Sequence, residues 1–248
     1  MLEKIYLIGI GPGEIKYLTL EAKELIERLS LFLIPKKDGA KKDLTLARLS
    51  LLEKIKGKKG YEIIFLPFPE REKGINYKEK VREWRQKKAE ILKEVLLAAE
   101  AKEAGFLIWG DPTIYDGHIE IFQEIEKDLP IKWEVIPGLS AFQVLASKCK
   151  CSLTELSTPL SFHTPRTLRV LKEITHPIVV FLDNYETYKK FKEHPLELIW
   201  GAFVGSKDEI IMRGNLKDIA ESHSLMRKDL RNKKGYLMEI YILKPLKS

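Results

Sequence analysis

The sequence predicts an α/β protein made of two α/β domains, with a parallel sheet in the first domain and a mixed sheet in the second. In residues 1–150, short apolar runs alternate with longer helical stretches, the pattern of a parallel sheet covered by helices. In residues 151–248, strand-like segments crowd together and only short helices separate them. The chain has 248 residues, 44% of them hydrophobic, which is enough for two packed cores. We therefore predict a domain boundary near Lys150.

Five apolar runs predict the strands of the first domain. Residues 5–10 are apolar throughout and end in glycines, as expected of a strand buried on both faces. Four further strands are expected at 31–34, 61–66, 106–109 and 133–136. The second of the five is expected to stop at Pro35.

Helical periodicity occupies the stretches between these runs. Thr19 opens the first helix, and Ala22, Leu25 and Ile26 share one face of it. Helices are expected at 19–30, 44–55, 77–104 and 118–127, and from about Ser140. The longest carries an approximate apolar stripe that includes Trp84, which favours a core position for this side chain over stacking on a ligand.

The second domain is expected to mix strands with short helices. Its strands are predicted at 178–182, 198–204, 209–212 and 237–243, and its helices at 167–173, 185–193 and 217–223.

Composition excludes several classes of protein. No apolar run approaches the roughly 20 residues of a membrane span, and we expect no secretion signal. The two cysteines, Cys149 and Cys151, cannot stabilise a protein of this size through a disulfide bond, so we expect a reduced, cytoplasmic protein. The net charge is +7, and nine Lys and Arg face three acids between Pro35 and Gly60. This cluster suits a polyanion, either a nucleic acid or a small polycarboxylate, and equally suits a solubilising surface.

The first strand ends in a glycine-rich turn at residues 9–13, GIGPG. Glycines after a first strand let the backbone approach a ligand at the carboxyl edge of the sheet. A dinucleotide-binding loop is not favoured, because Glu14 occupies the place of its last glycine and residues 34–36 lack the ribose-binding acid. The alternative for the loop alone is a tight turn without a ligand.

Two further strands end in similar turns. The fourth is followed by GDPTIY at 110–115 and the fifth by PGLSA at 137–141. Since the carboxyl ends of parallel strands meet at one edge, we expect the three turns to converge there. Asp111 supplies a negative acceptor, although a turn-capping role is the alternative.

The chain carries four motifs in the order GxGPG, YLTLEA at 17–22, GDPxxY and PGLSA. With these motifs in this order, it resembles the tetrapyrrole (corrin/porphyrin) methylase superfamily. The stretches 41–48, 77–84, 199–216 and 235–243 are most similar to the members that act in cobalamin biosynthesis and lose an acetyl unit. The family usually has Asp where this chain has Glu14. The resemblance implies two α/β domains with the active site in the cleft between them. It further implies methyl transfer from S-adenosylmethionine to C-1 of precorrin-5, with release of acetate, to give precorrin-6A in a homodimer.

The resemblance also implies residue roles. Contacts to S-adenosylmethionine would come from Gly11, Pro12, Gly110, Asp111, Ile114, Ser140, Ala141, Leu182, Asp183 and Gly205. Loss of the acetyl group needs a positioned water, for which the candidate catalytic residues are Asp111, Tyr115 and His163; an ordinary surface role is the alternative for His163. The carboxylates of the macrocycle would be bound by Lys42, Arg48, Arg82, Arg85 and Arg166, unless these are solvated surface charges. No metal is expected, because the five histidines are scattered and Cys149-x-Cys151 lacks a metal-binding spacing.

Three alternatives remain at this point. The acceptor could be another corrin position, uroporphyrinogen, or the modified histidine of elongation factor 2 on which diphthine synthases act. A basic nucleic-acid-binding module would fit the net charge, but the sequence lacks an Arg-rich helix or an aromatic RNA-stacking signature. An NAD oxidoreductase is disfavoured by the failed dinucleotide fingerprint. We therefore expect a small polycarboxylate substrate, no nucleic acid and no membrane partner.

Overall fold

The chain divides into two compact units, Met1–Leu139 and Ser140–Ser248, in a computed structural model that describes residues 2–70 and 76–246. The division comes earlier than the boundary predicted near Lys150. Helix α5 (Ala141–Lys148) accounts for the difference, because it packs against strands of the second unit.

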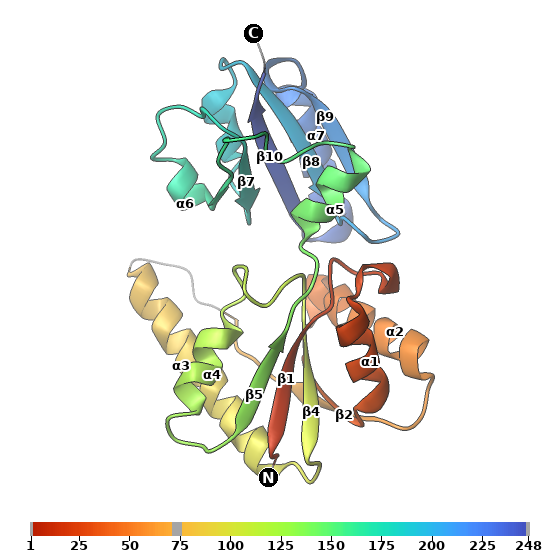
Figure 1. The fold of residues 1–248 in the computed structure, drawn as a ribbon. Coiled ribbons are helices and arrows are strands. Elements are labelled where there is room, and N and C mark those ends of the chain that lie inside the picture. The colour runs from red at the N-terminus through yellow and green to blue at the C-terminus, as the bar shows by residue number, and fades with distance from the viewer. Residues whose placement is uncertain (1, 71–75, 247–248) are drawn as a thin grey trace. The chain divides into compact units, whose positions relative to one another are not determined.

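The first unit contains a five-stranded parallel sheet in the order β3-β2-β4-β1-β5 (Figure 1). Its strands are β1 (Lys4–Gly9), β2 (Leu31–Pro35), β3 (Glu62–Leu66), β4 (Glu103–Ile108) and β5 (Lys132–Ile136). The predicted parallel sheet is confirmed, and the apolar runs locate all five strands. The central strands are buried on both faces, which explains why they are apolar throughout.

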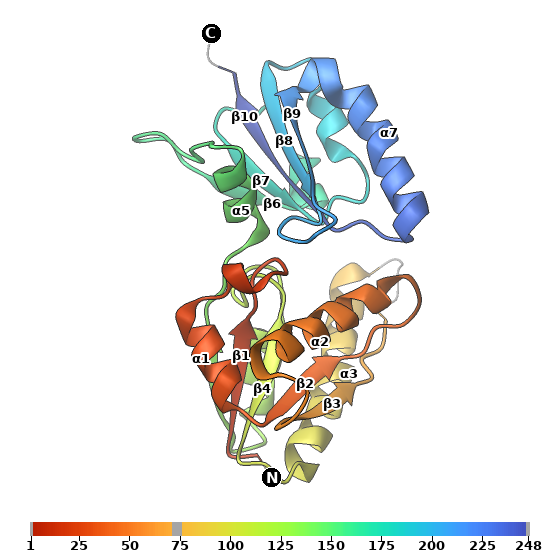
Figure 2. The ribbon, with the colours of Figure 1, turned by 90° about the vertical axis from the view of Figure 1, so that its right-hand side faces the viewer.

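Four α-helices cover this sheet, two on each face (Figures 1 and 2). Helices α1 (Leu20–Arg28) and α2 (Lys42–Lys56) lie on one face, and α3 (Tyr77–Ala98) and α4 (His118–Ile125) on the other. Short 3-10 turns at Ile15–Tyr17 and Gly39–Lys41 precede α1 and α2. The prediction that the third helix reaches residue 104 is wrong, because Ala99 turns to an extended conformation and β4 begins at Glu103.

The order of the strands determines where a ligand can bind. Strands β2 and β4 are neighbours, yet β2 leads into α2 on one face and β4 leads into α4 on the other. In open parallel sheets, such a reversal leaves a crevice at the carboxyl ends of the two strands. The loops after β1 and β4 both belong to this edge.

The second unit contains a mixed sheet in the order β6-β7-β10-β8-β9. Only β6 and β7 are parallel to one another, and the other neighbours are antiparallel. The strands are β6 (Ser161–His163), β7 (Ile178–Phe181), β8 (Leu196–Ala202), β9 (Ile210–Asn215) and β10 (Glu239–Pro245). The predicted mixed sheet is therefore confirmed, although β6 was not predicted.

Helices α5, α6 (Pro165–Leu168) and α7 (Leu216–Lys234) complete the second unit, together with a 3-10 segment at Thr187–Phe191. Helix α7 is much longer than the predicted 217–223. Asn215 caps its start by accepting a hydrogen bond from Lys217 N, and Gly235 ends it in a left-handed conformation (φ 73°). Among the described residues, no helix combines the length and the apolar character that crossing a membrane requires.

Candidate active site

Three loops meet at the carboxyl edge of the first sheet. The loops after β1 and β4 form a small antiparallel bridge, in which Gly110 N donates to Gly11 O at 2.9 Å and Gly11 N donates to Gly110 O at 3.3 Å. The turn after β5 joins them, because Gly138 N donates to Asp111 Oδ2 at 2.9 Å. The predicted convergence of these three turns is confirmed.

The turns approach one another too closely for side chains. A Cβ atom on Gly138 would lie 2.2 Å from Gly110 O, and one on Gly9 would lie 2.7 Å from Gly138 N. Gly11 has a positive φ of 66°, and a Cβ atom there would lie 2.8 Å from Tyr17 O. Gly9 and Gly138 are therefore needed for the contact between the loops, and Gly11 for the turn that leads to Tyr17.

Asp111 fastens two of the loops. Its Oδ1 accepts hydrogen bonds from Thr113 N at 2.8 Å and from the Thr113 hydroxyl, while Oδ2 accepts from Gly138 N. Both carboxylate oxygens are thus engaged in loop structure, as in the turn-capping alternative. Its roles towards a ligand or in catalysis remain predictions.

The other predicted site residues of the first unit line the same loops. Pro12 is buried, Ile114 is half-buried and Tyr115 is 49% exposed. Tyr115 adopts a left-handed conformation (φ 54°), and partial burial raises the pKa of its hydroxyl, which stays neutral near pH 7. The edge therefore presents backbone groups together with the side chains of Ile114 and Tyr115.

The predicted second-unit residues differ in how much of them is available to a ligand. Ser140 is buried and its N–H donates to Gln143 Oε1 at 2.9 Å, which starts α5 at Ala141. Gly205 has a positive φ of 80°, and its N–H donates to Glu209 Oε2 at 2.7 Å. Leu182 follows β7 with a positive φ of 59° and is 65% exposed, so its backbone strain and apolar surface mark a candidate contact.

Asp183 is only 1% exposed. Its carboxylate accepts hydrogen bonds from Tyr241 Oη at 2.6 Å, Thr187 N at 2.7 Å and Tyr185 N at 2.9 Å. The side chain therefore shapes the segment after β7, and a ligand at this position would contact Leu182 or the backbone.

His163 lies at the carboxyl end of β6. It pairs with Val180 of β7, so it shares that end of the second sheet with Leu182. Its Nε2 is 3.0 Å from Ser161 Oγ, which is also 2.9 Å from Nε2 of His176. Burial, and to a lesser degree His176, lowers the pKa of His163. No described residue forms a hydrogen bond with its buried Nδ1. The ring is therefore neutral near pH 7 and can accept a proton.

The predicted carboxylate-binding cations fall into two groups. Lys42, Arg82 and Arg166 are exposed, and Arg85 contacts Glu120 Oε1 at 3.3 Å. Arg48, however, is 7% exposed, and it donates to the backbone oxygens of Leu107 and Leu44 at 3.0 and 3.1 Å. Burial lowers the pKa of Arg48 to about 10. Its guanidinium ties α2 to β4.

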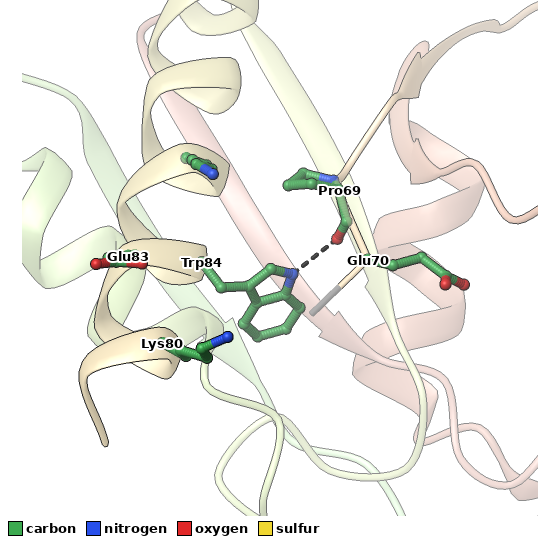
Figure 3. Close-up of a pocket in the computed structure, with 6 residues that line it drawn as sticks. Pro69, Glu70, Lys80, Glu83 and Trp84 are labelled. Carbon is green, nitrogen blue, oxygen red and sulfur yellow. Dashed lines mark hydrogen bonds between the residues drawn. The ribbon is translucent and has the colours of Figure 1, made fainter. Parts of the chain in front are cut away.

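Trp84 of α3 is half-buried at the rim of a small surface pocket (Figure 3). Its indole N–H donates to Pro69 O at 2.7 Å. The pocket is lined by Pro69, Glu70, Lys80, Glu83, Trp84 and Lys87. The fixed indole is thus part of the wall between α3 and the segment after β3.

A polar trio, in which Lys88 and His118 are buried and Asp116 is half-buried, was missed by sequence reasoning. Lys88 is 3% exposed and its Nζ lies 2.7 Å from His118 Nε2, while His118 Nδ1 lies 2.5 Å from Asp116 Oδ1. One signal in the sequence could have identified it: Lys88 interrupts the apolar stripe of the long helix, four residues after Trp84 and four before Leu92. No group of three His, Cys, Asp or Glu able to hold a metal ion occurs in the described part of the chain.

The chain is similar to known proteins over most of its length. The family model for tetrapyrrole (corrin/porphyrin) methylases matches residues 4–220. A precorrin-6A synthase (deacetylating) from a Sinorhizobium species is 29% identical over 250 residues, which cover 98% of this chain and 95% of that protein.

Solved structures share the fold. A protein from Corynebacterium diphtheriae described as cobalamin synthesis related (CobF) has a TM-score of 0.82 at 24% identity, and the match covers both chains in full. A uroporphyrin-III C-methyltransferase from Thermus thermophilus, solved with S-adenosylhomocysteine, has a TM-score of 0.61 at 17% identity and covers 97% of each chain.

Proposed function

The chain belongs to the tetrapyrrole (corrin/porphyrin) methylases, and from this we propose that it methylates precorrin-5 at C-1 with release of acetate, giving precorrin-6A. The relative whose name describes this activity matches nearly the whole chain at 29% identity. Three of the motifs that carry the resemblance, GxGPG, GDPxxY and PGLSA, lie in the three loops that meet at the edge of the first sheet.

We propose that these loops hold S-adenosylmethionine, which supplies the methyl group as an electrophilic sulfonium. Gly11, Pro12, Gly110 and Ile114 would contact it from the first unit. Ser140, Ala141, Leu182 and Gly205 would contact it from the second, with Asp183 shaping its segment. Methyl transfer to carbon needs the reacting atoms held about 3–3.5 Å apart and in line, with water excluded. Rigid loops in direct backbone contact suit that task.

We propose that His163 assists the loss of the acetyl group. Release of acetate requires a water oxygen to bond to the acetyl carbonyl carbon while the bond from that carbon to the macrocycle breaks and leaves its electron pair on the macrocycle. A base must therefore accept a proton from that water. His163 is neutral and half-buried, and it lies at the same end of the second sheet as Leu182. Tyr115, which is neutral and 49% exposed, would donate a hydrogen bond to the developing oxyanion.

Exposed cations would bind the carboxylates of the macrocycle. Lys42, Arg82 and Arg166 are exposed and are proposed to pair with them. Arg48 is used within the fold, and Arg85 would have to leave Glu120 to do the same.

The observation that carries this proposal is the backbone bridge between Gly11 and Gly110 with Gly138 fastened beside it. The test is to incubate the purified protein with precorrin-5 and S-adenosylmethionine carrying a ¹³C-labelled methyl group. We expect the label at C-1 and one acetate released per methyl transferred. Faster methylation of uroporphyrinogen, of another precorrin position or of elongation factor 2 would overturn the assignment of the acceptor. Salt-sensitive RNA binding tighter than S-adenosylhomocysteine binding would overturn the assignment as an enzyme.

A further inference from the structure

Three polar side chains form a connected chain at the loop 110–117, with Lys88 and His118 buried and Asp116 half-buried. Asp116 belongs to this loop, His118 begins α4, and Lys88 comes from the middle of α3. Lys88 Nζ lies 2.7 Å from His118 Nε2, and His118 Nδ1 lies 2.5 Å from Asp116 Oδ1. The three groups thus connect the interior of the unit to the loop that carries Gly110, Asp111 and Ile114.

The bonds of Asp116 determine the protonation of the histidine. Asp116 Oδ1 also accepts from His118 N at 3.1 Å, so the loop carboxylate is the acceptor for both N–H groups of His118. With its proton on Nδ1, the neutral imidazole has only a lone pair at Nε2, and this must accept from Lys88. A charged lysine donates more strongly than a neutral amine, so the charge of Lys88 strengthens the bond at Nε2 and with it the hold on the ring orientation, while Asp116 sets the tautomer.

The surroundings make that charge easy to lose. Lys88 faces Asp116 from the loop, but it also faces the cations Lys37 after β2 and Arg85 on its own helix, while Arg48 of α2 acts on His118. Its Nζ lies 4.5 Å from the ring centres of Phe68 and Trp84. Burial, partly opposed by Asp116, lowers the pKa of Lys88 to about 7, and burial lowers the pKa of His118 as well. Lys88 can therefore change its charge near neutral pH.

The loop depends on this anchor because its backbone is strained next to it. Tyr115 and Gly117, the neighbours of Asp116, have positive φ values of 54° and 86°. Such a conformation in a tyrosine persists only where surrounding contacts enforce it. Asp111 fastens one end of the loop through Gly138, and Asp116 fastens the other through His118.

We propose that Lys88 is a positioning residue for the methyl donor: in its charged form, acting through His118 and Asp116, it holds residues 110–117 in the shape that binds the donor. This inference rests on the proposed function only in that the loop binds an S-adenosyl compound. It follows that donor affinity falls as Lys88 loses its proton.

The test is calorimetric titration of the full-length protein with S-adenosylhomocysteine from pH 6 to pH 8.5. For the wild type we expect about a tenfold loss of affinity across this range. Lys88→Arg keeps the charge and is expected to bind with a nearly constant affinity. Lys88→Met is expected to bind about tenfold more weakly than the wild type at pH 6 and to show no pH dependence. Lys87→Met removes the neighbouring exposed lysine and is expected to match the wild type. Titration of the ligand itself is common to all four proteins and cancels in the ratios.

A ligand-free measurement separates positioning from simple packing. ¹⁵N NMR of His118 at pH 6 is expected to show a proton on Nδ1 in both proteins, because Asp116 is present in both, and a shifted Nε2 resonance in Lys88→Met, where Nε2 loses its donor. Identical pH profiles for the wild type, Lys88→Arg and Lys88→Met would overturn the inference while leaving the proposed function intact. A wild type that binds no S-adenosylhomocysteine at any pH would instead overturn the proposed function.

Discussion

At the scale of single residues, Asp111 is the clearest case of a predicted ligand contact that also holds the fold. Its carboxylate accepts hydrogen bonds from two loops. Asp111→Ala removes both acceptors and leaves Gly138 N without its partner. We expect a loss of about 1–3 kcal/mol in stability and a clear loss of affinity for S-adenosylhomocysteine. Thermal melts and calorimetry would measure the two effects. Normal binding by the variant would show that the loops are not the donor site.

Lys88 makes a second residue-scale prediction, about stability. Its pKa is lowered from 10.5 to about 7 in the folded protein. Between these values the unfolded chain binds a proton that the folded chain does not, so the stability of the wild type should rise with pH from about 7 to about 10. The effect is at most about 5 kcal/mol. Urea unfolding at several pH values would show this slope, and Lys88→Met should flatten it whereas Lys87→Met should not. Parallel slopes for wild type and Lys88→Met would contradict the burial argument.

At the scale of elements, helix α1 is tied to the site by its first turn. Thr19 Oγ1 accepts from Ala22 N at 3.1 Å and donates to Pro137 O at 3.3 Å, so one hydroxyl caps the helix and contacts the third loop. Thr19→Val keeps the shape but loses both bonds. We expect about 1–2 kcal/mol of destabilisation, and Thr19→Ser should restore most of it. Urea unfolding would measure both variants, and an unchanged Thr19→Val would show that the cap is dispensable.

Elements also show what the sequence can and cannot predict. The strands of the first sheet are predictable because burial on both faces makes them apolar throughout. Helix α7 is mostly polar, so its apolar periodicity fades and its real end is set by Gly235. Strand β6 has three residues and is too short for an alternation to be visible.

The candidate site was predictable in part: the sequence shows where its turns lie but not which of its side chains are buried. Glycine-bearing turns after β1, β4 and β5 are visible in the sequence, and the parallel order brings them together. The sequence does not show which charged side chains stabilise the fold instead of binding a ligand. Arg48 and Asp183 look like surface charges in the sequence, but both are buried and form hydrogen bonds within the fold. That distinction depends on contacts between residues far apart in the chain.

At the scale of the whole molecule, each of the two units has its own hydrophobic core. If the donor binds both, S-adenosylhomocysteine should raise the unfolding temperatures of both units together. The gain is about 2.7 kcal/mol at a hundredfold excess over the dissociation constant. Scanning calorimetry would measure it, and NADH should have no effect. A shift confined to one calorimetric transition would place the donor in one unit alone. Analytical ultracentrifugation would test the homodimer that the family resemblance predicts.

The lack of space for a side chain at Gly138 has a consequence for engineering. A single methyl group there would lie 2.2 Å from Gly110 O, and one on Gly9 would lie 2.7 Å from Gly138 N. The three turns therefore pack so closely that a side chain added to one of them would collide with another. A chimera that imports only one turn from a related methylase should misfold at this edge, whereas transplanting all three as a set should preserve it. To change the specificity of the enzyme to another macrocycle, one should therefore keep the three turns unchanged and redesign the exposed cations instead.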